Sequence, residues 1–346
     1  MKRKFKIKSN RSLFFNWGWL LAISLTFHLI HNATAENWNQ KADMPIPRLF
    51  FSVSTVDNQL YTIGGMLAEP VDFVDAYDPD ADKWIQKAGL PAARAGIVTC
   101  VVGGKIYAIG GWSAQAPALG SVEEYNPATD TWTQKADMPT PRSFFTATAV
   151  DGKIYAIGGI AQNVGPVLPA VEEYNPATDT WTQKADMPIP VSGMAATSID
   201  GKIYLIGGTP AVQGPVLETV QEYDPATDTW SKKADMPTPR TALAVGVVNE
   251  KIYAVGGTSV VQGPGLTTVE IYDPDNDTWT EGTEMPTARV FLGVGTIEKN
   301  IYAVGGVAEG LDPAILPTVE QFVPSGLSVT VLNRFLTVWG IIKKTN

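Results

Sequence analysis

The stretch VEEYNPATDTWTQKADMP occurs twice in the chain, at residues 122–139 and again, letter for letter, at residues 171–188. A third copy with small changes, VQEYDPATDTWSKKADMP, follows at residues 220–237. A catalytic group is needed once per site, so verbatim repetition indicates architecture first. Any specific activity should then depend on the positions at which the copies differ.

Two independent markers show that the unit is repeated six times. Tryptophans recur at Trp38, Trp84, Trp132, Trp181, Trp230 and Trp279. Gly-Gly pairs begin at Gly64, Gly110, Gly158, Gly207, Gly256 and Gly305. Both series advance by 46, 48, 49, 49 and 49 residues. Identical spacing of two markers is the signature of a repeat architecture.

Each unit predicts four short strands. The first follows a Met-Pro-x-x-Arg corner, as at Arg142, and is apolar or small on both sides, as expected for a strand covered on both faces. A tight turn such as Asp151-Gly152 leads to the second strand, KIYAIGG. A variable loop, the strand VEEY, the turn NPATD and the strand TWTQKA complete the unit. No segment shows a helical period, so the sequence predicts an all-β fold.

A four-stranded sheet of this size cannot bury both faces by itself. Six sheets stacked radially can do so, and closure of the circle also protects the sheet edges. The sequence therefore predicts a six-bladed β-propeller with four antiparallel strands per blade. The recurring Trp and Tyr residues are expected to pack between blades.

The Gly-Gly pair, the Tyr of the third strand, the Trp seven residues after it (Tyr125 to Trp132) and the following MPTPR resemble the kelch repeat family. The resemblance covers about residues 38–324. It implies a kelch-type propeller in which the two ends of the chain share one blade. The N-terminal strand at Trp38 would complete the last blade, whose third strand ends at Phe322. A strand from the tail, residues 325–346, is the competing candidate for this closing position.

The first 35 residues have the features of a secretory signal peptide. Six basic residues precede an apolar run at about residues 17–30, and Ala33-Thr34-Ala35 provides a small-residue cleavage site. The predicted domains are a signal peptide at 1–35, a propeller at 36–324, and a tail at 325–346 that forms an extra strand or hairpin. We expect export to the periplasm or the extracellular space. Membrane contact is expected only through an uncleaved signal segment or the tail.

The composition of the mature chain excludes several functional classes. Removing residues 1–35 removes six basic and no acidic residues, so the net charge falls from −9 to −15. This charge argues against nucleic acid as a partner. Both histidines, His28 and His31, lie in the signal segment. Catalytic triads with histidine and histidine-based zinc or copper sites are therefore excluded.

No cofactor and no metal site is predicted. The turns DPDAD and DPDND have the acidic spacing of a calcium loop, but Thr278 stands where such a loop has Gly. Turn formation explains these aspartates adequately. The single cysteine, Cys100, aligns with small residues of the other units and is expected to be a buried, inert thiol.

The candidate site lies on the face that carries the variable 2–3 loops and the 4–1 connections. Five arginines stand there at the start of the first strands, and Val191 interrupts the series in the fourth unit: Arg48, Arg94, Arg142, Arg240 and Arg289. In one interpretation they bind loop carbonyls or a neighbouring acid. In the other they form a funnel of guanidinium groups for the carboxylate of a peptide or sugar acid. The residues alone favour the first interpretation, and the resemblance adds support to the second, because kelch relatives commonly bind partners on this face.

Trp112 is the only tryptophan in these loops. It is expected either to stack on a sugar or anchor a peptide, or to pack beneath its own loop. We therefore predict a secreted kelch-repeat binding or scaffold protein whose partner is a protein or a glycan, including one that bears a carboxylate. A structural role in an envelope assembly is a further interpretation.

The alternative is an enzyme acting on a sugar acid, an epimerase or mutarotase similar to the exported sialic acid epimerase of the kelch class. Its acid or base would come from the loops, where Glu69, Glu218, Glu309 and Asp312 are the candidates. A copper oxidase of the galactose oxidase type is excluded, because its copper requires histidine. No catalytic set is concentrated in the sequence, and a non-enzymatic function is therefore preferred.

Overall fold

The computed structural model describes residues 36–161, 165–308 and 315–324. The predicted signal peptide and tail lie outside these ranges. The described residues form one compact unit. Within the described ranges, no helix is long and apolar enough to cross a membrane.

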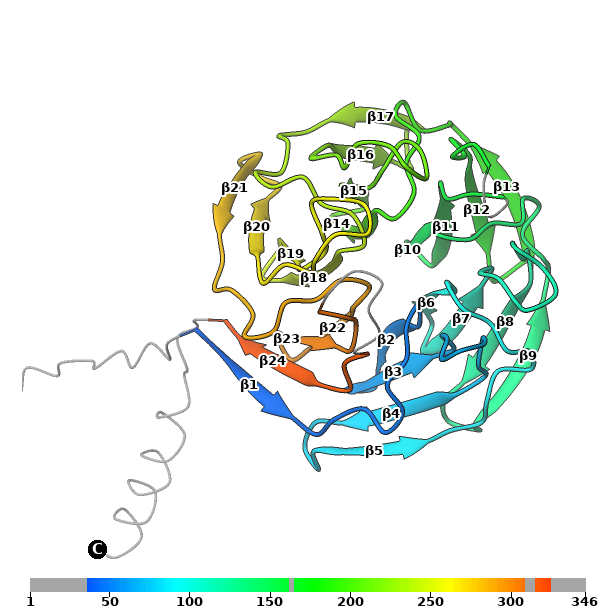
Figure 1. Ribbon diagram of the computed structural model, residues 1–346. Helices are drawn as coiled ribbons and strands as arrows, with labels where there is room; N and C mark the ends of the chain where they lie inside the picture. Colours follow the sequence, from blue (N-terminus) through cyan, green and yellow to red (C-terminus); the bar gives the residue numbers. More distant parts are fainter. Residues whose placement is uncertain (1–35, 162–164, 309–314, 325–346) are drawn as a thin grey trace, which may run out of the picture. The chain divides into compact units, whose positions relative to one another are not determined.

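The described residues of this unit form six four-stranded antiparallel sheets arranged around a common axis (Figure 1). Blade 1 contains β2 (Ser52–Val56), β3 (Gln59–Ile63), β4 (Val74–Asp78) and β5 (Lys83–Gln86). Blade 2 contains β6 (Val98–Val102), β7 (Lys105–Ile109), β8 (Val122–Asn126) and β9 (Thr131–Lys135). Blade 3 contains β10 (Thr146–Val150), β11 (Lys153–Ile157), β12 (Val171–Asn175) and β13 (Thr180–Lys184).

The remaining blades follow the same order from the axis outward. Blade 4 contains β14 (Ala195–Ile199), β15 (Lys202–Ile206), β16 (Val220–Asp224) and β17 (Thr229–Lys232). Blade 5 contains β18 (Ala244–Val248), β19 (Lys251–Val255), β20 (Val269–Asp273) and β21 (Thr278–Glu281). Blade 6 contains β22 (Gly293–Ile297), β23 (Asn300–Val304), β24 (Val319–Val323) and β1 (Asn37–Lys41).

Blade 6 joins the two ends of the propeller. β1 pairs antiparallel with β24, and Trp38 stands opposite Phe322. The Trp38 indole packs on the Phe322 ring at 5.1 Å between centroids and donates a hydrogen bond to the Thr283 carbonyl of blade 5 at 3.0 Å. The predicted six-bladed fold and its closure by the N-terminal strand are thus confirmed.

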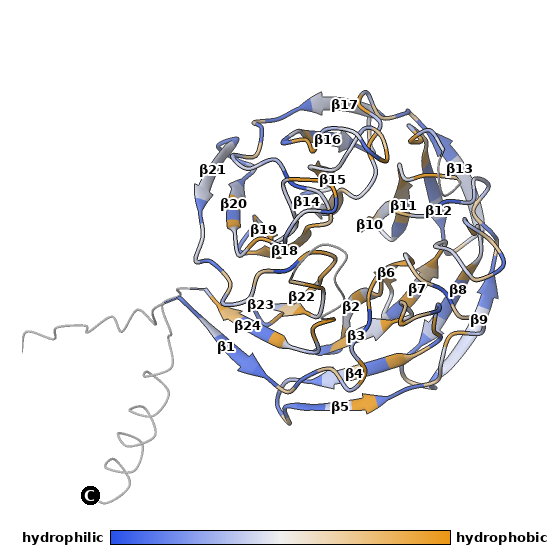
Figure 2. Cartoon of the chain, viewed as in Figure 1, coloured by the Kyte–Doolittle hydropathy of each residue, from blue (hydrophilic) through white to orange (hydrophobic). Residues whose placement is uncertain are grey.

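The hydrophobic core lies between adjacent blades. Figure 2 shows hydrophobic residues concentrated on the inner strands and hydrophilic residues on outer strands such as β9, β13 and β17. The second strands are almost fully buried, as Ile154 and Ile157 illustrate at 0% exposure. Successive side chains of a strand point to opposite faces, so a strand that is covered on both faces needs apolar residues at nearly every position.

The repeated eighteen residues connect each blade to the one before it. In blade 2, Trp132 donates its indole N–H to the Ala88 carbonyl of blade 1 at 2.9 Å. Asp130 accepts a hydrogen bond from the Ala88 amide at 2.8 Å and another from the Tyr125 hydroxyl at 2.5 Å. We call this Tyr–Asp–Trp set, with the Ala of the preceding blade, the inter-blade clasp. It recurs in the blades of Trp84, Trp181, Trp230 and Trp279.

The clasp explains why the turn NPATD ends in Asp. Asp130 has φ of 53°, a left-handed conformation that Asp tolerates better than most residues. The hydrogen bond from Tyr125 lowers the pKa of Asp130, with the Ala88 amide as the next cause. The verbatim repetition therefore serves architecture, as the sequence indicates.

Candidate functional site at the loop face of the propeller axis

The five arginines of the candidate site lie in the interior, each with 0% exposure. Arg142 shows the pattern. Its guanidinium donates to the carbonyls of Thr140 at 3.2 Å, Gly158 at 3.2 Å and Ala170 at 2.9 Å, and to the Glu172 carboxylate at 2.6 Å. The other four form equivalent pairs: Arg48–Asp75, Arg94–Glu123, Arg240–Glu270 and Arg289–Glu320. Burial lowers the pKa of each arginine, and the paired carboxylate opposes that shift.

Blade 4 replaces both members of this pair by neutral residues. Val191 occupies the arginine position and is fully buried. Gln221 occupies the acid position, where its amide accepts from the Ile189 N–H at 3.0 Å and donates to the Ile189 carbonyl at 3.0 Å. A carboxylate at residue 221 would face no cation, which is costly in a buried site. The loss of the arginine is therefore matched by the loss of the acid.

This placement corresponds to the structural interpretation of the arginines, in which they bind loop carbonyls and a neighbouring acid. It does not correspond to an open funnel, because none of these five guanidinium groups faces solvent. Arg94 borders a cavity of about 680 Å3, which Glu69 and Glu123 also line. Ligand binding by the arginines stays a prediction, and in this conformation a ligand would have to break their ion pairs.

A second set of six equivalent residues surrounds the axis on the same face, two positions after each arginine or its replacement. We call these the axial positions: Phe50, Gly96, Phe144, Gly193, Ala242 and Phe291. All six have positive φ, between 50° and 66°. Their backbones link adjacent blades, since the Gly193 N–H donates to the Phe144 carbonyl at 3.1 Å and the Ala242 N–H to the Gly193 carbonyl at 2.8 Å. The left-handed conformation is thus built into the blade junctions.

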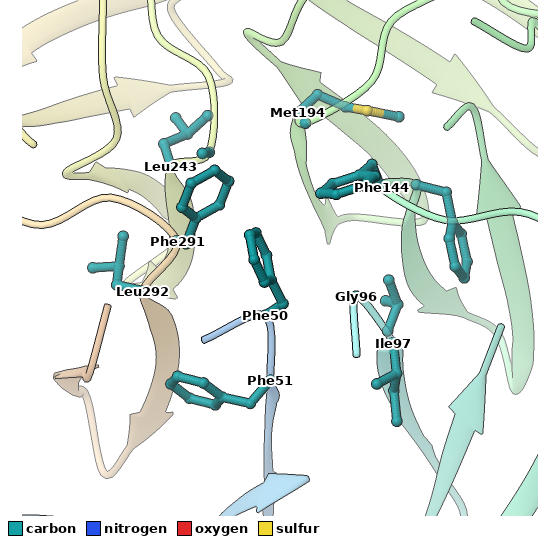
Figure 3. A pocket seen from close by; sticks show the side chains of 13 residues that line it. Phe50, Phe51, Gly96, Ile97, Phe144, Met194, Leu243, Phe291 and Leu292 are labelled. Atoms are coloured by element: carbon teal, nitrogen blue, oxygen red, sulfur yellow. The ribbon is translucent and has the colours of Figure 1, made fainter. Parts of the chain in front are cut away.

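The large side chains at the axial positions form an aromatic cluster with Trp112. Phe50 lies 4.7 Å from Phe291, 5.8 Å from Phe144 and 5.2 Å from Trp112, measured between ring centroids. Figure 3 shows Phe50, Phe144 and Phe291 extending toward the axis from three different blades. All four rings are half-buried, so each keeps a surface that faces solvent.

Trp112 fills the space that a side chain at Gly96 would otherwise occupy. A Cβ atom on Gly96 would lie 1.8 Å from Cζ3 of Trp112, which excludes any larger residue there. The indole stacks on Phe144 at 4.9 Å between centroids with an interplanar angle of 23°. Trp112 therefore packs within the face and remains half-exposed. Its contact with a ligand stays a prediction.

A pocket of about 310 Å3 lies beside the aromatic cluster, over blades 4 and 5. Its walls are three axial phenylalanines, the small axial residues Gly193 and Ala242, and the 2–3 loops of those two blades. Four hydroxyl residues also line it: Ser192, Thr209, Thr241 and Thr258. None of the lining residues carries a charge. A smaller cavity of about 160 Å3 lies at the axis, and the side chains that line it include Phe51, Ile97, Met194, Leu243 and Leu292 (Figure 3).

The sequence reasoning missed this pocket. The signal was present two residues after the arginine column, where the six units carry Phe, Gly, Phe, Gly, Ala and Phe. The large residues of this series form the aromatic cluster, and the small residues Gly193 and Ala242 lie beneath the pocket.

The remaining candidates are placed as follows. Among the described residues, no group of acidic, histidine or cysteine side chains could hold a metal ion. Asp273 instead accepts hydrogen bonds from the amides of its own turn. Cys100 is buried, as expected, and burial raises the pKa of its thiol to about 12. Two of the four loop acids, Glu309 and Asp312, lie outside the described residues.

Comparisons with known proteins agree with this architecture. A family model, the KLHDC2/KLHL20/DRC7 Kelch-repeats domain, matches three overlapping segments, residues 20–159, 90–232 and 162–306. The solved structure of YjhT is similar, with a TM-score of 0.70 and 18% sequence identity over 81% of this chain and 95% of that one. At this identity the likeness concerns the fold alone. No curated protein matches the chain.

Proposed function

The chain belongs to the kelch-repeat family, whose propellers generally bind proteins, and on this premise we propose an exported binding protein that recognises a protein partner through its loop face. The observation that carries the proposal is the half-exposed aromatic cluster of Phe50, Trp112, Phe144 and Phe291 beside an uncharged pocket. Aromatic residues at the centre of a surface, next to a pocket, are typical of the residues that dominate binding energy in protein interfaces.

The chemistry of the pocket supports binding over catalysis. An epimerase or mutarotase requires a positioned acid or base, and none of the residues that line the axial pocket is titratable near neutral pH. The larger cavity beside Arg94 contains one cation and two carboxylates, those of Glu69 and Glu123. It therefore offers no surplus positive charge for a sugar acid. A protein partner agrees better with these sites than a carboxylate-bearing sugar does.

Export is part of the proposal and depends on the N-terminal 35 residues. The basic segment, the apolar run and the Ala33-Thr34-Ala35 site support it. The single cysteine is free and buried, so the fold does not depend on a disulfide bond, and this is compatible with export.

The test is affinity capture with the mature domain, residues 36–346, as bait and exported proteins of the source organism as prey. The key variant is Phe144→Ala combined with Phe291→Ala, which removes two walls of the cluster. The matched control is Thr133→Ala with Thr182→Ala, two exposed positions on the outer strands β9 and β13. A partner retained by the wild type and the control but lost by the phenylalanine variant would support the proposal. A partner that the phenylalanine variant also retains, or that only the control loses, would refute it.

A further inference from the structure

We propose that the pocket over Gly193 and Ala242 receives one uncharged aromatic side chain of the partner, a tyrosine or a tryptophan. This inference rests on the proposed function and deepens it by naming the chemistry of the anchor. It is carried by the comparison of the six equivalent axial positions with one another.

The axial positions show what the fold places above each blade. Phe50, Phe144 and Phe291 fill this space with their own rings. At Gly96 the space is filled by the ring of Trp112, which comes from another segment of the chain. At Gly193 the nearest side chain is the small Thr241, whose Oγ1 would lie 2.6 Å from a Cβ atom placed there. No aromatic ring among the described residues covers Gly193 or Ala242, and the pocket of about 310 Å3 remains. Four of the six places thus hold an aromatic ring, and the two small residues leave room for another.

Trp112 acts as an internal template for the missing ring. It covers a glycine and stacks on the neighbouring Phe144. The pocket offers a related arrangement two blades further on, because Gly193 donates a backbone hydrogen bond to Phe144, as Gly96 does to Phe50, and Phe144 also lines the pocket. Aromatic rings favour stacked or edge-on contacts with one another beyond the area that they bury. The walls supplied by Phe50, Phe144 and Phe291 therefore favour an aromatic occupant over an aliphatic one.

The polar lining restricts the occupant further. The hydroxyls of Ser192 and Thr209 lie 3.5 Å apart, at the limit of a hydrogen bond, so both retain capacity for a better partner. No charged residue lines the pocket, and a charged group would lose its hydration there without compensation. A ring with one hydrogen-bonding edge, such as a phenol or an indole, satisfies both conditions. The volume is at the lower end for ligand pockets, roughly 300 Å3, which agrees with one side chain.

The first experiment measures the preference of the wild-type mature domain with four small probes. These are N-acetyl-tyrosinamide, N-acetyl-tryptophanamide, N-acetyl-leucinamide and N-acetyl-lysinamide, titrated with saturation-transfer NMR as the readout. We expect dissociation constants of about 1 mM for the aromatic probes and binding at least about tenfold weaker for the lysine probe. Equal binding of the lysine probe, or no binding of either aromatic probe, would overturn the inference. This comparison needs no variant.

The second experiment fills the pocket from within. Ala242 has φ of 52°, within the range of 50° to 56° at which Phe50, Phe144 and Phe291 already hold a phenylalanine. Ala242→Phe should therefore fold with an unchanged unfolding midpoint and reduce binding of the aromatic probes at least about tenfold. The matched control is Ala177→Phe, an exposed turn residue on the opposite face, which should bind the probes as the wild type does. Aromatic binding retained by folded Ala242→Phe would overturn the inference.

The outcomes separate this inference from the proposed function. If Ala242→Phe captures the protein partner as the wild type does, the pocket is not the anchor site, and the loop face remains the binding surface. If the wild type binds the aromatic probes but the Phe144→Ala, Phe291→Ala variant still captures the partner, the pocket stands and the proposed interface fails.

Discussion

The matched neutral pair of blade 4 makes a quantitative prediction about the charged pairs of the other blades. Arg142→Val alone would leave the buried Glu172 carboxylate with only the Thr140 hydroxyl, which donates to it at 2.7 Å. Breaking a buried ion pair on one side costs about 3 to 5 kcal/mol, because the remaining charge is not compensated. Arg142→Val combined with Glu172→Gln reproduces the chemistry found at Val191 and Gln221. The double variant should therefore be more stable than the single one.

The size of the recovery follows from the contacts that remain lost. Both variants remove the hydrogen bonds of Arg142 to three backbone carbonyls, each worth about 1 kcal/mol net. Only the single variant also carries the unpaired charge. We expect the double variant to recover about 2 kcal/mol, a rise of about 0.7 M in the urea midpoint for a slope of about 3 kcal/mol/M.

Urea unfolding followed by tryptophan fluorescence measures this difference. Gln221→Glu serves as the reverse test, because it places a carboxylate opposite Val191 without removing any arginine contact, and it should destabilise the domain by about the 2 kcal/mol that the unpaired charge costs. If the double variant is as unstable as the single one, or if Gln221→Glu has no effect, charge pairing does not determine the stability contributed by the arginine and acid positions. The carbonyl contacts of the arginine would then be its main contribution.

Three further predictions concern the clasp, the aromatic cluster and the thiol. Hydrogen bonds from tyrosines lower the pKa of the clasp aspartates Asp82, Asp130, Asp179 and Asp228. The stability that these aspartates contribute is therefore complete above the unfolded pKa of about 4 and is lost as pH falls through the lowered folded-state pKa. Urea midpoints should drop from pH 6 to pH 3, and the drop should be less steep in Asp179→Asn. Trp112→Ala should open a second place over Gly96, and NMR titration should then show two bound aromatic probes per chain in place of one. Burial and a pKa of about 12 should keep Cys100 unreactive toward a thiol reagent at pH 8 until the domain is unfolded in urea.

The fold could be predicted from the sequence because its information is local and repeated. The recurrence of Trp132 and Tyr125 with their counterparts fixes the blade count, and each unit contains its own turn signals. The partial units at the two ends, Trp38 and Phe322, indicate the closing blade in the same way. No contact had to be known in order to count these units.

The arginine columns were harder to interpret, because their partners are distant in the sequence. Arg142 and Glu172 are separated by 30 residues, and the pair becomes visible only when both columns are compared across the six units. Blade 4 then supplies the evidence, since Val191 and Gln221 change together. The same comparison would have predicted burial of the arginines, because a ligand-binding cation needs no matched acid within its own blade.

Local propensity does not predict the positive φ of the axial phenylalanines, because bulky residues rarely adopt it. The function of this backbone strain is therefore a separate question. A phenylalanine with positive φ costs roughly 1 to 2 kcal/mol, yet Phe50, Phe144 and Phe291 all hold this conformation. Glycine at Gly96 and Gly193 meets the same backbone requirement without that cost. The bulky residues therefore need compensation from what their rings contact, and strained residues of this kind concentrate at binding sites.

A pair of substitutions separates the backbone from the ring. Phe144→Gly and Phe144→Ala both remove the ring, but only glycine also relieves the backbone, so the glycine variant should be more stable by about 1 kcal/mol. This order is the reverse of the usual preference for alanine over glycine. Both variants should lose the aromatic probes and the protein partner alike. If the glycine variant is the less stable one, the left-handed conformation is not held in solution. If it keeps the partner, the strain at Phe144 serves packing between blades and not recognition.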